Sequence, residues 1–313
     1  MRAMIPGSGG GSNRGLRAMA AAGAAVLATV AGGLPEAAAQ QTERVDLGVP
    51  ISADAYIRVF LEGEGSVRIV GWNADSVHVN GTHTAGVGQV AVGGDESSAK
   101  VGYWPDAEGH SGRADLEVRL PASATVWVKL TDASADISGV TGGLDVYAIK
   151  GDVRVSGNPS ELSAESMGGG LELSGASPTV KAKTGSGPIT FRGESDDVSL
   201  MSVSGRITVS GPRLKWGHFE SVKGDIVFEG DLAKGGSVTF KNHHGRIELH
   251  LPEQVGAEFT VTTWEGELTS DFDLGPEAEG DARAGKRRTF TVGKGLASVD
   301  IQNFGGDVRI ERR

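Results

Sequence analysis

Apolar and polar residues alternate in short runs along most of the chain, and from residue 121 onward these runs recur at a nearly constant spacing. Each repeat contains a small turn residue; four intervals of eighteen residues are followed by intervals of nineteen, twenty-one, twenty-one and forty. The turn residues are Ala133, Gly151, Gly169, Gly187, Gly205, Gly224, Gly245, Gly266 and Gly306. So regular a period is typical of a solenoid, in which one supersecondary unit stacks on the next.

Each repeat also holds two pairs of apolar residues, and the members of a pair are two residues apart. One pair follows the turn residue, as Ile189 and Phe191 do, and the other precedes it, as Val180 and Ala182 do. Side chains two residues apart on a strand point to the same face. The pattern therefore predicts two short strands per coil, joined by a tight turn at one edge and a variable loop at the other. The expected fold class is all-β: a single-domain β-solenoid, similar to a parallel β-helix, with 18–21 residues per coil.

Small polar residues recur three positions before the turn residue, where a side chain would point into the corner of a coil. They are Ser166, Thr184, Ser202, Ser221, Asn242, Thr263 and Asn303. Buried polar groups need partners, so we expect these side chains to hydrogen-bond the backbone of the turns. Outside the coil, Arg206, Asp225, Arg246 and Glu267 alternate in charge one residue after the turn, an order that favours correct coil register.

The repeat is less regular at both ends. The stretch "GSVRIVGW" matches one strand of a coil, whereas "SVHVNGTH", "QVAVGGD", "KVGYW" and "DLEVRLP" predict less regular strands. We therefore expect an N-terminal β cap over residues 40–120 and the solenoid repeat region over residues 121–313. Late in the chain, the charged stretch "GPEAEGDARAGKRR" predicts a mobile loop, and the closing "ERR" is expected to place charge beside an open strand edge.

Residues 1–39 have a different character. Three arginines precede the apolar run "AMAAAGAAVLATVAGGL", and small residues ending in "PEAAAQ" follow it. This pattern predicts a signal peptide cleaved after Ala39, with a retained signal anchor as the alternative. We therefore expect an exported protein, in the periplasm, on the outer surface or secreted, with no transmembrane segment after cleavage. The chain has no cysteine, which excludes disulfides, thiol catalysis and a lipidated cysteine anchor.

The charge of the chain disfavours nucleic acid as a partner. The full sequence carries a formal net charge of −10. Removing residues 1–39 takes away three arginines and one glutamate, which leaves 27 basic and 39 acidic residues and a net charge of −12. Such a surface repels the phosphate backbone.

Several motifs together resemble a known family. They are the signal sequence, "GSVRIVGW", the paired "LEVRLP" and "IELHLP", a repeated Gly, charged residue and alternating apolar pattern, and the closing "NFGGDVRI". Over residues 45–313 the chain resembles the bacterial putative-adhesin family of β-strand repeats, a domain of unknown function. The resemblance implies a β-solenoid at the cell envelope, and it carries no catalytic or ligand-binding position with it.

Candidate chemistry is sparse. The chain contains no Walker loop, dinucleotide-binding fingerprint, G-x-S-x-G elbow or H-E-x-x-H sequence. Repeats stacked in sequence order would bring Glu229, His250 and Asp271 into one outward column at about 4.8 Å spacing, with Glu248 beside it. Such a column could coordinate a divalent cation or hold the carboxylate pair of a retaining glycosidase. The alternative is a row of solvated charges, because the neighbouring residues in the sequence do not predict the burial that would raise the pKa of a catalytic acid. We predict no catalytic, cofactor-binding or metal site and keep these three residues as surface candidates.

Aromatic side chains occupy one column of the late repeats, two positions before the turn residue. They are His243, Trp264 and Phe304. If this column is exposed, Trp264 is a candidate for stacking on sugar rings; the alternative is packing at the corner of the coil.

The sequence thus favours an exported cell-envelope β-solenoid with a structural or adhesive, surface-binding role and no catalysis. Its expected partner is a cell-surface polysaccharide or an envelope protein. The alternative is a polysaccharide-processing enzyme of the parallel β-helix type that uses carboxylates on one face of the solenoid.

Overall fold

The computed structural model describes residues 41–275 and 285–313, and the predicted signal peptide lies outside these residues. The described residues form strands and turns, and none of them belongs to a helix that could span a membrane. The strands are β1 (Thr42–Pro50), β2 (Tyr56–Trp72), β3 (Ser76–Thr84), β4 (Gln89–Gly94), β5 (Ser98–Trp104), β6 (Arg113–Pro121), β7 (Thr125–Ser138), β8 (Gly143–Lys150), β9 (Val153–Gly157), β10 (Glu161–Ser166), β11 (Leu171–Ala176), β12 (Thr179–Thr184), β13 (Ile189–Glu194), β14 (Asp197–Ser202), β15 (Ile207–Ser221), β16 (Ile226–Asn242), β17 (Ile247–Leu251), β18 (Ala257–Thr263), β19 (Leu268–Ser270), β20 (Lys286–Val292), β21 (Ala297–Asn303) and β22 (Val308–Arg312).

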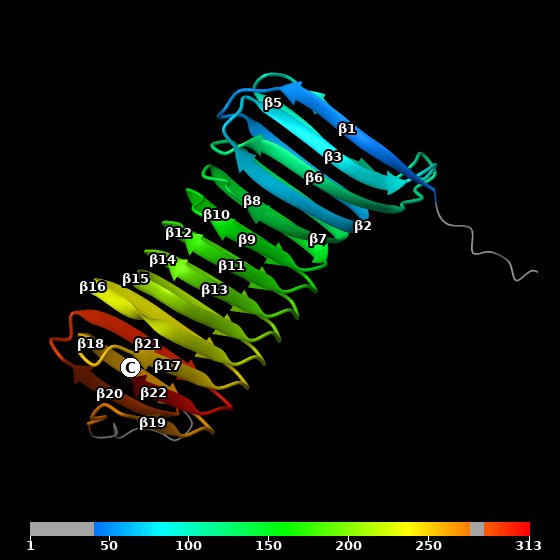
Figure 1. Ribbon diagram of the computed structural model, residues 1–313. Coiled ribbons are helices and arrows are strands. Elements are labelled where there is room, and N and C mark those ends of the chain that lie inside the picture. The colour runs from blue at the N-terminus through cyan, green and yellow to red at the C-terminus, as the bar shows by residue number, and fades with distance from the viewer. Residues whose placement is uncertain (1–40, 276–284) are drawn as a thin grey trace, which may run out of the picture. The chain divides into compact units, whose positions relative to one another are not determined.

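The strands stack into two ladders, and each coil contributes one strand to each ladder (Figure 1). The first ladder runs β4, β5, β2 (residues 56–61), β7 (125–130), β8, β10, β12, β14, β15 (216–221), β16 (237–242), β21, β18 and β20. The second ladder runs β1, β3, β6, β2 (64–72), β7 (132–138), β9, β11, β13, β15 (207–210), β16 (226–229), β17, β22 and β19. The all-β solenoid expected from the sequence is confirmed.

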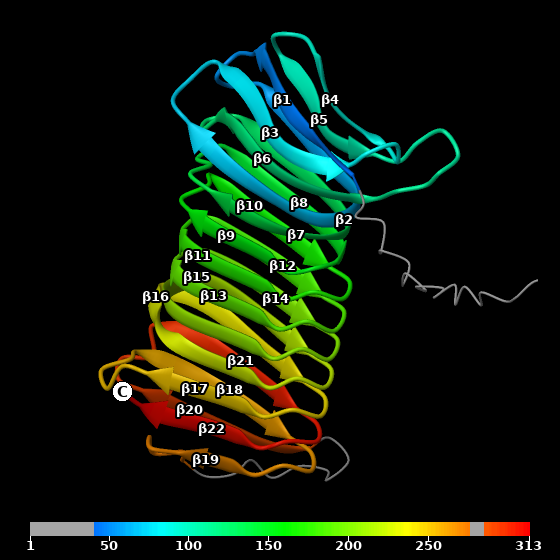
Figure 2. The same cartoon turned by 45° about the vertical axis from the view of Figure 1, so that its right-hand side comes forward.

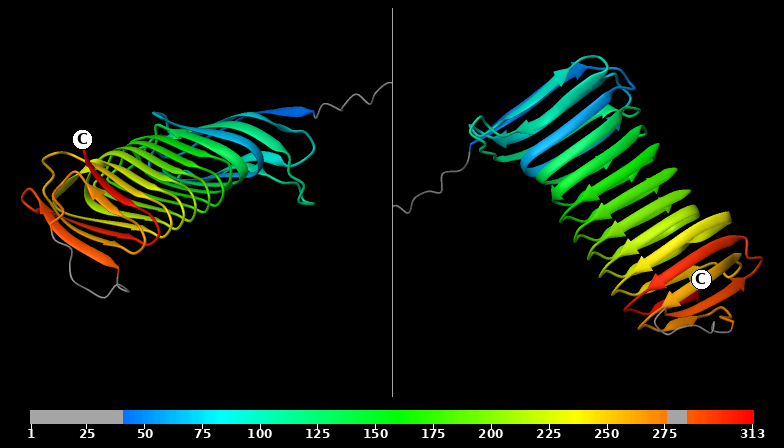
Figure 3. Two further views of the ribbon diagram at one scale, coloured as in Figure 1. Left: turned by 90° about the horizontal axis from the view of Figure 1, so that it is seen from below. Right: turned by 180° about the vertical axis from the view of Figure 1, so that it is seen from behind.

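The core lies between the two ladders, which face each other as layers joined at two edges (Figure 3). The apolar residues that the repeat places on an inward face are buried, except Leu268 after the turn residue Gly266, which is partly buried. Near the middle of the solenoid, Phe219 and Phe240 of the first ladder stack with ring centroids 5.0 Å apart. Phe228 of the second ladder packs against Phe240 at 5.6 Å, so aromatic rings join the two layers.

The regular coil begins earlier than residue 121. β2 pairs in parallel with β7 in both ladders and is therefore a complete coil. Beyond it, β5 and β6 continue the two ladders in parallel, whereas β1, β3 and β4 pair antiparallel (Figure 2). The irregular strands predicted for the N-terminal region thus extend the solenoid at one end.

The coils at the C-terminal end do not stack in sequence order. β21 pairs with β16 on one side and β18 on the other, and β22 lies between β17 and β19 (Figure 2). The final coil is therefore inserted between two coils that precede it in the chain. Of the charged stretch predicted to be a mobile loop, residues 276–284 lie outside the described residues, but Lys286–Arg288 form the start of β20. The expected edge position of the closing "ERR" is wrong, because Glu311 and Arg312 belong to an internal strand.

Polar side chains at the corner secure the tight turns as expected. Ser202 and Ser221 accept hydrogen bonds from the N–H groups of Gly205 and Gly224 at 2.8 and 2.9 Å. Asn303 Nδ2 donates to the carbonyl oxygens of Gly245 and Gly306 at 3.1 and 2.7 Å. These bonds replace the water that the buried corner excludes.

The backbone that each turn glycine lies against shows which coils are neighbours. A Cβ added to Gly245 would overlap the carbonyl of Gly224, and one added to Gly266 would overlap the carbonyl of Gly306. Backbones approach too closely at Gly245 and Gly266 for a side chain, so glycine is required at these two positions. Gly266 stacks on Gly306, which agrees with the inserted final coil.

Candidate functional site

The predicted column of Glu229, His250 and Asp271 lies on the outer face of the second ladder. Glu229 on β16 pairs with His250 on β17, as expected. The next position is occupied by Glu311 of β22, which pairs with His250. Asp271 follows only after it, since its N–H bonds the carbonyl of Ile310. The expected direct stacking of Asp271 on His250 is therefore wrong, and the order is Glu229, His250, Glu311, Asp271.

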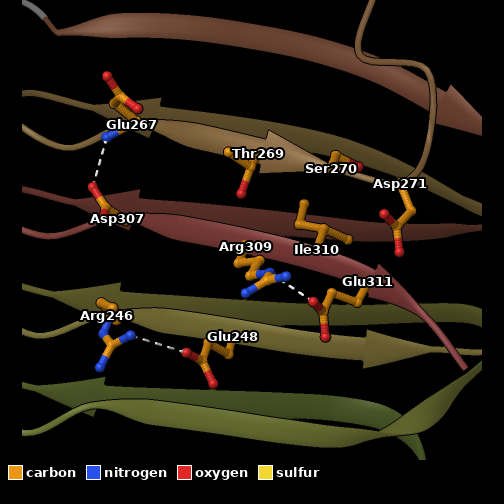
Figure 4. Close-up of a pocket in the computed structure, with 10 residues that line it drawn as sticks. All are labelled: Arg246, Glu248, Glu267, Thr269, Ser270, Asp271, Asp307, Arg309, Ile310 and Glu311. Carbon is orange, nitrogen blue, oxygen red and sulfur yellow. Dashed lines mark hydrogen bonds and ion pairs between the residues drawn. The ribbon is translucent and has the colours of Figure 1, made fainter.

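A groove of about 350 Å³ lies on this face and crosses three neighbouring strands (Figure 4). Its lining comes from β17, β22 and β19 and from residues that directly flank these strands: Arg246, Glu248, Glu267, Thr269, Ser270, Asp271, Asp307, Arg309, Ile310 and Glu311. The inserted strand puts Asp307 beside Glu267 and Glu311 beside Asp271. The sequence predicted that charges alternate in the column Arg206, Asp225, Arg246 and Glu267. Asp307 lies between Arg246 and Glu267 in the structure, so the alternation ends where the acidic residues Asp307 and Glu267 are neighbours.

Several charged side chains of this face are already paired. Glu311 contacts Arg309 at 2.6 Å and His250 at 3.0 Å, and Glu229 contacts Arg313 at 3.1 Å. Asp271 Oδ2 accepts a hydrogen bond from the N–H of Arg312 at 3.1 Å. Asp271 and Glu229 are exposed to solvent, so neither has the burial that raises the pKa of a general acid.

The same face offers no obvious cation site. Among the residues that the structure describes, no group of three or more histidine or acidic side chains is arranged to hold a metal ion. The groove is therefore an open, charged surface in which carboxylates neutralise nearby cations.

Trp264 lies in a stack of three aromatic rings at the tight-turn edge. Its ring is 4.1 Å from that of Phe304, with an angle of 9° between the planes. His243 covers the opposite face of Phe304 at 4.7 Å and 5°. The inserted coil creates this order, since Phe304 separates two residues that precede it in the chain. One face of Trp264 is thus occupied by Phe304, which leaves less of the indole available for a sugar ring.

A second aromatic group, which the repeat analysis missed, lies on the outer face of the first ladder near its N-terminal end. The ring of Phe60 on β2 is 5.7 Å from that of Trp104 on β5 and 5.4 Å from that of Trp127 on β7. All three residues are partly exposed. We call them the aromatic cluster.

A sequence signal for this cluster exists. Phe60 stands between the buried Val59 and Leu61, and Trp127 stands between the buried Val126 and Val128. In a strand that alternates, an aromatic residue between two inward-facing apolar residues points outward. The strands "RVFLE" and "TVWVK" therefore carry apolar residues on both faces. Packing of the core explains only the inward face and leaves the outward aromatic residue unexplained.

Comparison with known families finds one match. The family model described as Toastrack DUF4097 matches residues 160–311, which confirms the resemblance noted from the repeat. No curated protein matches the chain significantly.

Similar solved structures share little sequence with the chain. A putative adhesin from Bacteroides fragilis is 9% identical, with a TM-score of 0.49, over 87% of this chain and 98% of that one. A putative adhesin from Parabacteroides distasonis is 11% identical, with a TM-score of 0.47, over 87% of this chain and 97% of that one. A structure described as a putative lipid binding protein from the same species is 12% identical, with a TM-score of 0.35, over 86% and 96% of the two chains.

Proposed function

We propose that this chain, whose residues 160–311 carry the Toastrack repeat, is an exported cell-envelope solenoid that binds a cell-surface polysaccharide and performs no catalysis. The observation that carries the proposal is the aromatic cluster of Phe60, Trp104 and Trp127 on an outward face. The export part of the proposal rests on the signal-like pattern of residues 1–39.

The position of the aromatic cluster argues for binding. The solvent face of a sheet is normally polar, and three contacting aromatic rings there expose apolar surface at a cost. The flat faces of Trp and Phe suit the apolar faces of sugar rings, and an indole N–H group is a donor for a sugar hydroxyl. A stack of rigid coils holds such rings at fixed positions, so little conformational entropy is lost on binding.

A polysaccharide-processing enzyme is the second candidate. In its favour, Glu311 and Asp271 occupy neighbouring strands, and paired carboxylates are the catalytic groups of retaining glycosidases. Against it, Glu311 is engaged by both Arg309 and His250, and Asp271 is exposed. The non-catalytic reading therefore remains the better supported one.

The test uses the full purified protein with peptidoglycan, lipopolysaccharide and a panel of soluble polysaccharides, and it measures both retained protein and released oligosaccharide. We expect retention without release. Trp127→Ala should weaken retention, whereas Trp216→Ala should not, because Trp216 is 58% exposed and lies outside the aromatic cluster. Trp264→Ala tests the other aromatic candidate.

Each outcome has a definite meaning. Release of oligosaccharide that disappears in Glu311→Gln would favour the enzyme. Equal retention of the Trp127→Ala variant and the parent protein would remove the aromatic cluster from the proposal. Absence of both retention and release across the panel would contradict polysaccharide binding. Thermal unfolding of each variant, compared with the parent, separates loss of binding from loss of folding.

A further inference from the structure

A pocket of about 330 Å³ adjoins the aromatic cluster on the outer face of the first ladder, where β4, β5 and β2 lie side by side. Arg58, Lys100 and Trp104 provide its large side chains. The rest of its lining consists of the smaller residues Ala91, Val92, Gly93, Gly94, Ser98 and Ala99. Large side chains beside a floor of small ones produce the depression, and its volume lies near the lower end of ligand pockets, roughly 300–1,000 Å³.

Two cations meet in this pocket. Arg58 and Lys100 are register partners on adjacent parallel strands, so both side chains project from the same outer face. Among the described residues, neither forms an ion pair with a carboxylate. Like charges directly opposite each other repel, and in the described part of the chain no ion pair offsets that repulsion. An unneutralised pair of cations is unexpected on a chain with a net charge of −10.

The guanidinium of Arg58 is also incompletely bonded. Its Nε atom is buried and has no hydrogen-bond partner. The group lies 5.7 Å from the ring centroid of Tyr56, a contact that involves the face of the ring and leaves the donor unused. Buried donors almost always have an acceptor, and no group among the described residues supplies one for this Nε, so its hydrogen-bonding capacity is unused.

The neighbouring rings identify the rest of the ligand. Trp104 forms part of the pocket wall and contacts Phe60, which contacts Trp127 in turn. A sugar ring stacked on this wall would bring a substituent within reach of Arg58 and Lys100. A guanidinium binds carboxylate and phosphate in a bidentate manner, and an ammonium adds a second charge-assisted bond.

We propose that Arg58, Lys100 and Trp104 form a subsite for an acidic polysaccharide, in which the carboxylate or phosphate of one sugar residue bonds the two cations. The inference rests on the proposed polysaccharide-binding function and specifies the chemistry of its ligand. Basic and aromatic residues also occur together at membrane surfaces, but there they form broad patches on net cationic surfaces. Here two cations line a concave pocket of an acidic protein, which favours a single anionic group.

Gly93 provides a variant that blocks the pocket without altering its charge. A Cβ added at Gly93 meets no atom within 4 Å. Gly93→Phe should therefore fold normally and fill the pocket. Arg58→Met removes the charge and keeps the aliphatic stem. The matched control is Arg68→Met, which makes the same change on an exposed residue of β2 that lies in the second ladder.

Binding to the full protein is measured by calorimetry with polygalacturonate, its methyl ester, a neutral galactan, a phosphorylated mannan and phosphatidylglycerol vesicles. We expect polygalacturonate, if the subsite takes a carboxylate, or the phosphorylated mannan, if it takes a phosphate, to bind at least about tenfold more tightly than the methyl ester and the neutral galactan, since hydrogen bonds to charged groups are the stronger ones. Arg58→Met and Gly93→Phe should each lose about that factor, and Arg68→Met should not. High salt should weaken binding of the acidic probes only.

A second measurement avoids dependence on the chosen polymers. The Nε–H resonance of Arg58, identified by its loss in Arg58→Met, should shift with glucuronate or with inorganic phosphate and not with glucose. No shift with either anion overturns the subsite. Preferential binding of the vesicles overturns the polysaccharide as ligand. Retention of neutral and acidic polymers with equal affinity, still dependent on Trp127, rejects the subsite and leaves the proposed function standing.

Discussion

Ile301→Ala tests the insertion of the final coil. Ile301 on β21 is fully buried and pairs with Phe240 of β16 on one side and Val261 of β18 on the other. The exchange removes three side-chain carbons, whose lost transfer free energy, at about 0.8 kcal/mol each, is roughly 2.4 kcal/mol. The cavity that remains raises the expected loss of stability to about 2–5 kcal/mol.

The location of the damage distinguishes the two possible coil orders. If β21 lies between β16 and β18, Ile301→Ala should lower protection from hydrogen exchange in residues 237–242 and in residues 257–263 together. If the coils stacked in sequence order, β21 would adjoin only the preceding coil, and residues 237–242 would keep their protection. Exchange followed by mass spectrometry resolves these two segments, and urea unfolding gives the total change in free energy.

Leu200→Ala is the matched control. Leu200 is equally buried, but it lies between Ala182 of β12 and Phe219 of β15, where the coils follow the sequence. It should lower protection in the strands on both sides of it and leave residues 257–263 unchanged. A loss of protection in residues 257–263 alone, when Ile301 is shortened, would refute the inserted order.

Three further predictions concern the core, the corner and one carboxylate. Ile226→Asp should prevent native folding, because it buries a charge between the two ladders; a native Tm would contradict the assigned strand register. Ser221→Ala should cost about 1–3 kcal/mol, since the N–H of Gly224 loses its acceptor, whereas Ser204→Ala at the exposed turn should cost much less. Burial raises the pKa of Asp115, but hydrogen bonds from Arg113 and Ser66 outweigh it and hold that pKa below its ordinary value. Asp115→Asn should therefore reduce stability at pH 7. The difference should begin to shrink as pH falls through about 4, the ordinary pKa of an aspartate, and should disappear only below the lower pKa that the folded protein gives Asp115; a pH-independent difference would exclude this electrostatic origin.

The sequence predicted the fold best at positions where the geometry of the coil allows only one type of residue. Each turn glycine packs against the backbone of the neighbouring coil, so its spacing reported the coil length directly. The inward-facing residues were equally predictable from the sequence, because each strand must bury one face between the ladders. The corner hydroxyl and amide groups were predictable for the same reason, since a buried polar group must find a partner.

The candidate sites were less predictable because they depend on which strands become neighbours. Glu229 and His250 were assigned correctly as a pair, since their coils follow one another in the chain. Asp271 was assigned to the wrong neighbour, because Glu311 arrives from the end of the chain. The aromatic cluster combines residues from β2, β5 and β7, which no repeat period relates.

The sequence by itself determined the all-β class, the two strands per coil, the inward faces and the chemistry of the tight turns. These features are local, or they repeat so often that one coil predicts the next. Only the tertiary structure decided the order of the last coils, and with it the surroundings of Asp271 and Trp264. The reason is physical: coils with the same pattern of inward residues present nearly the same strand edge for pairing. The period of the repeat therefore does not show whether a coil pairs with the next coil in the sequence or with one from later in the chain. The same holds for Arg58 and Lys100, whose proximity depends on strand pairing rather than on their separation along the chain.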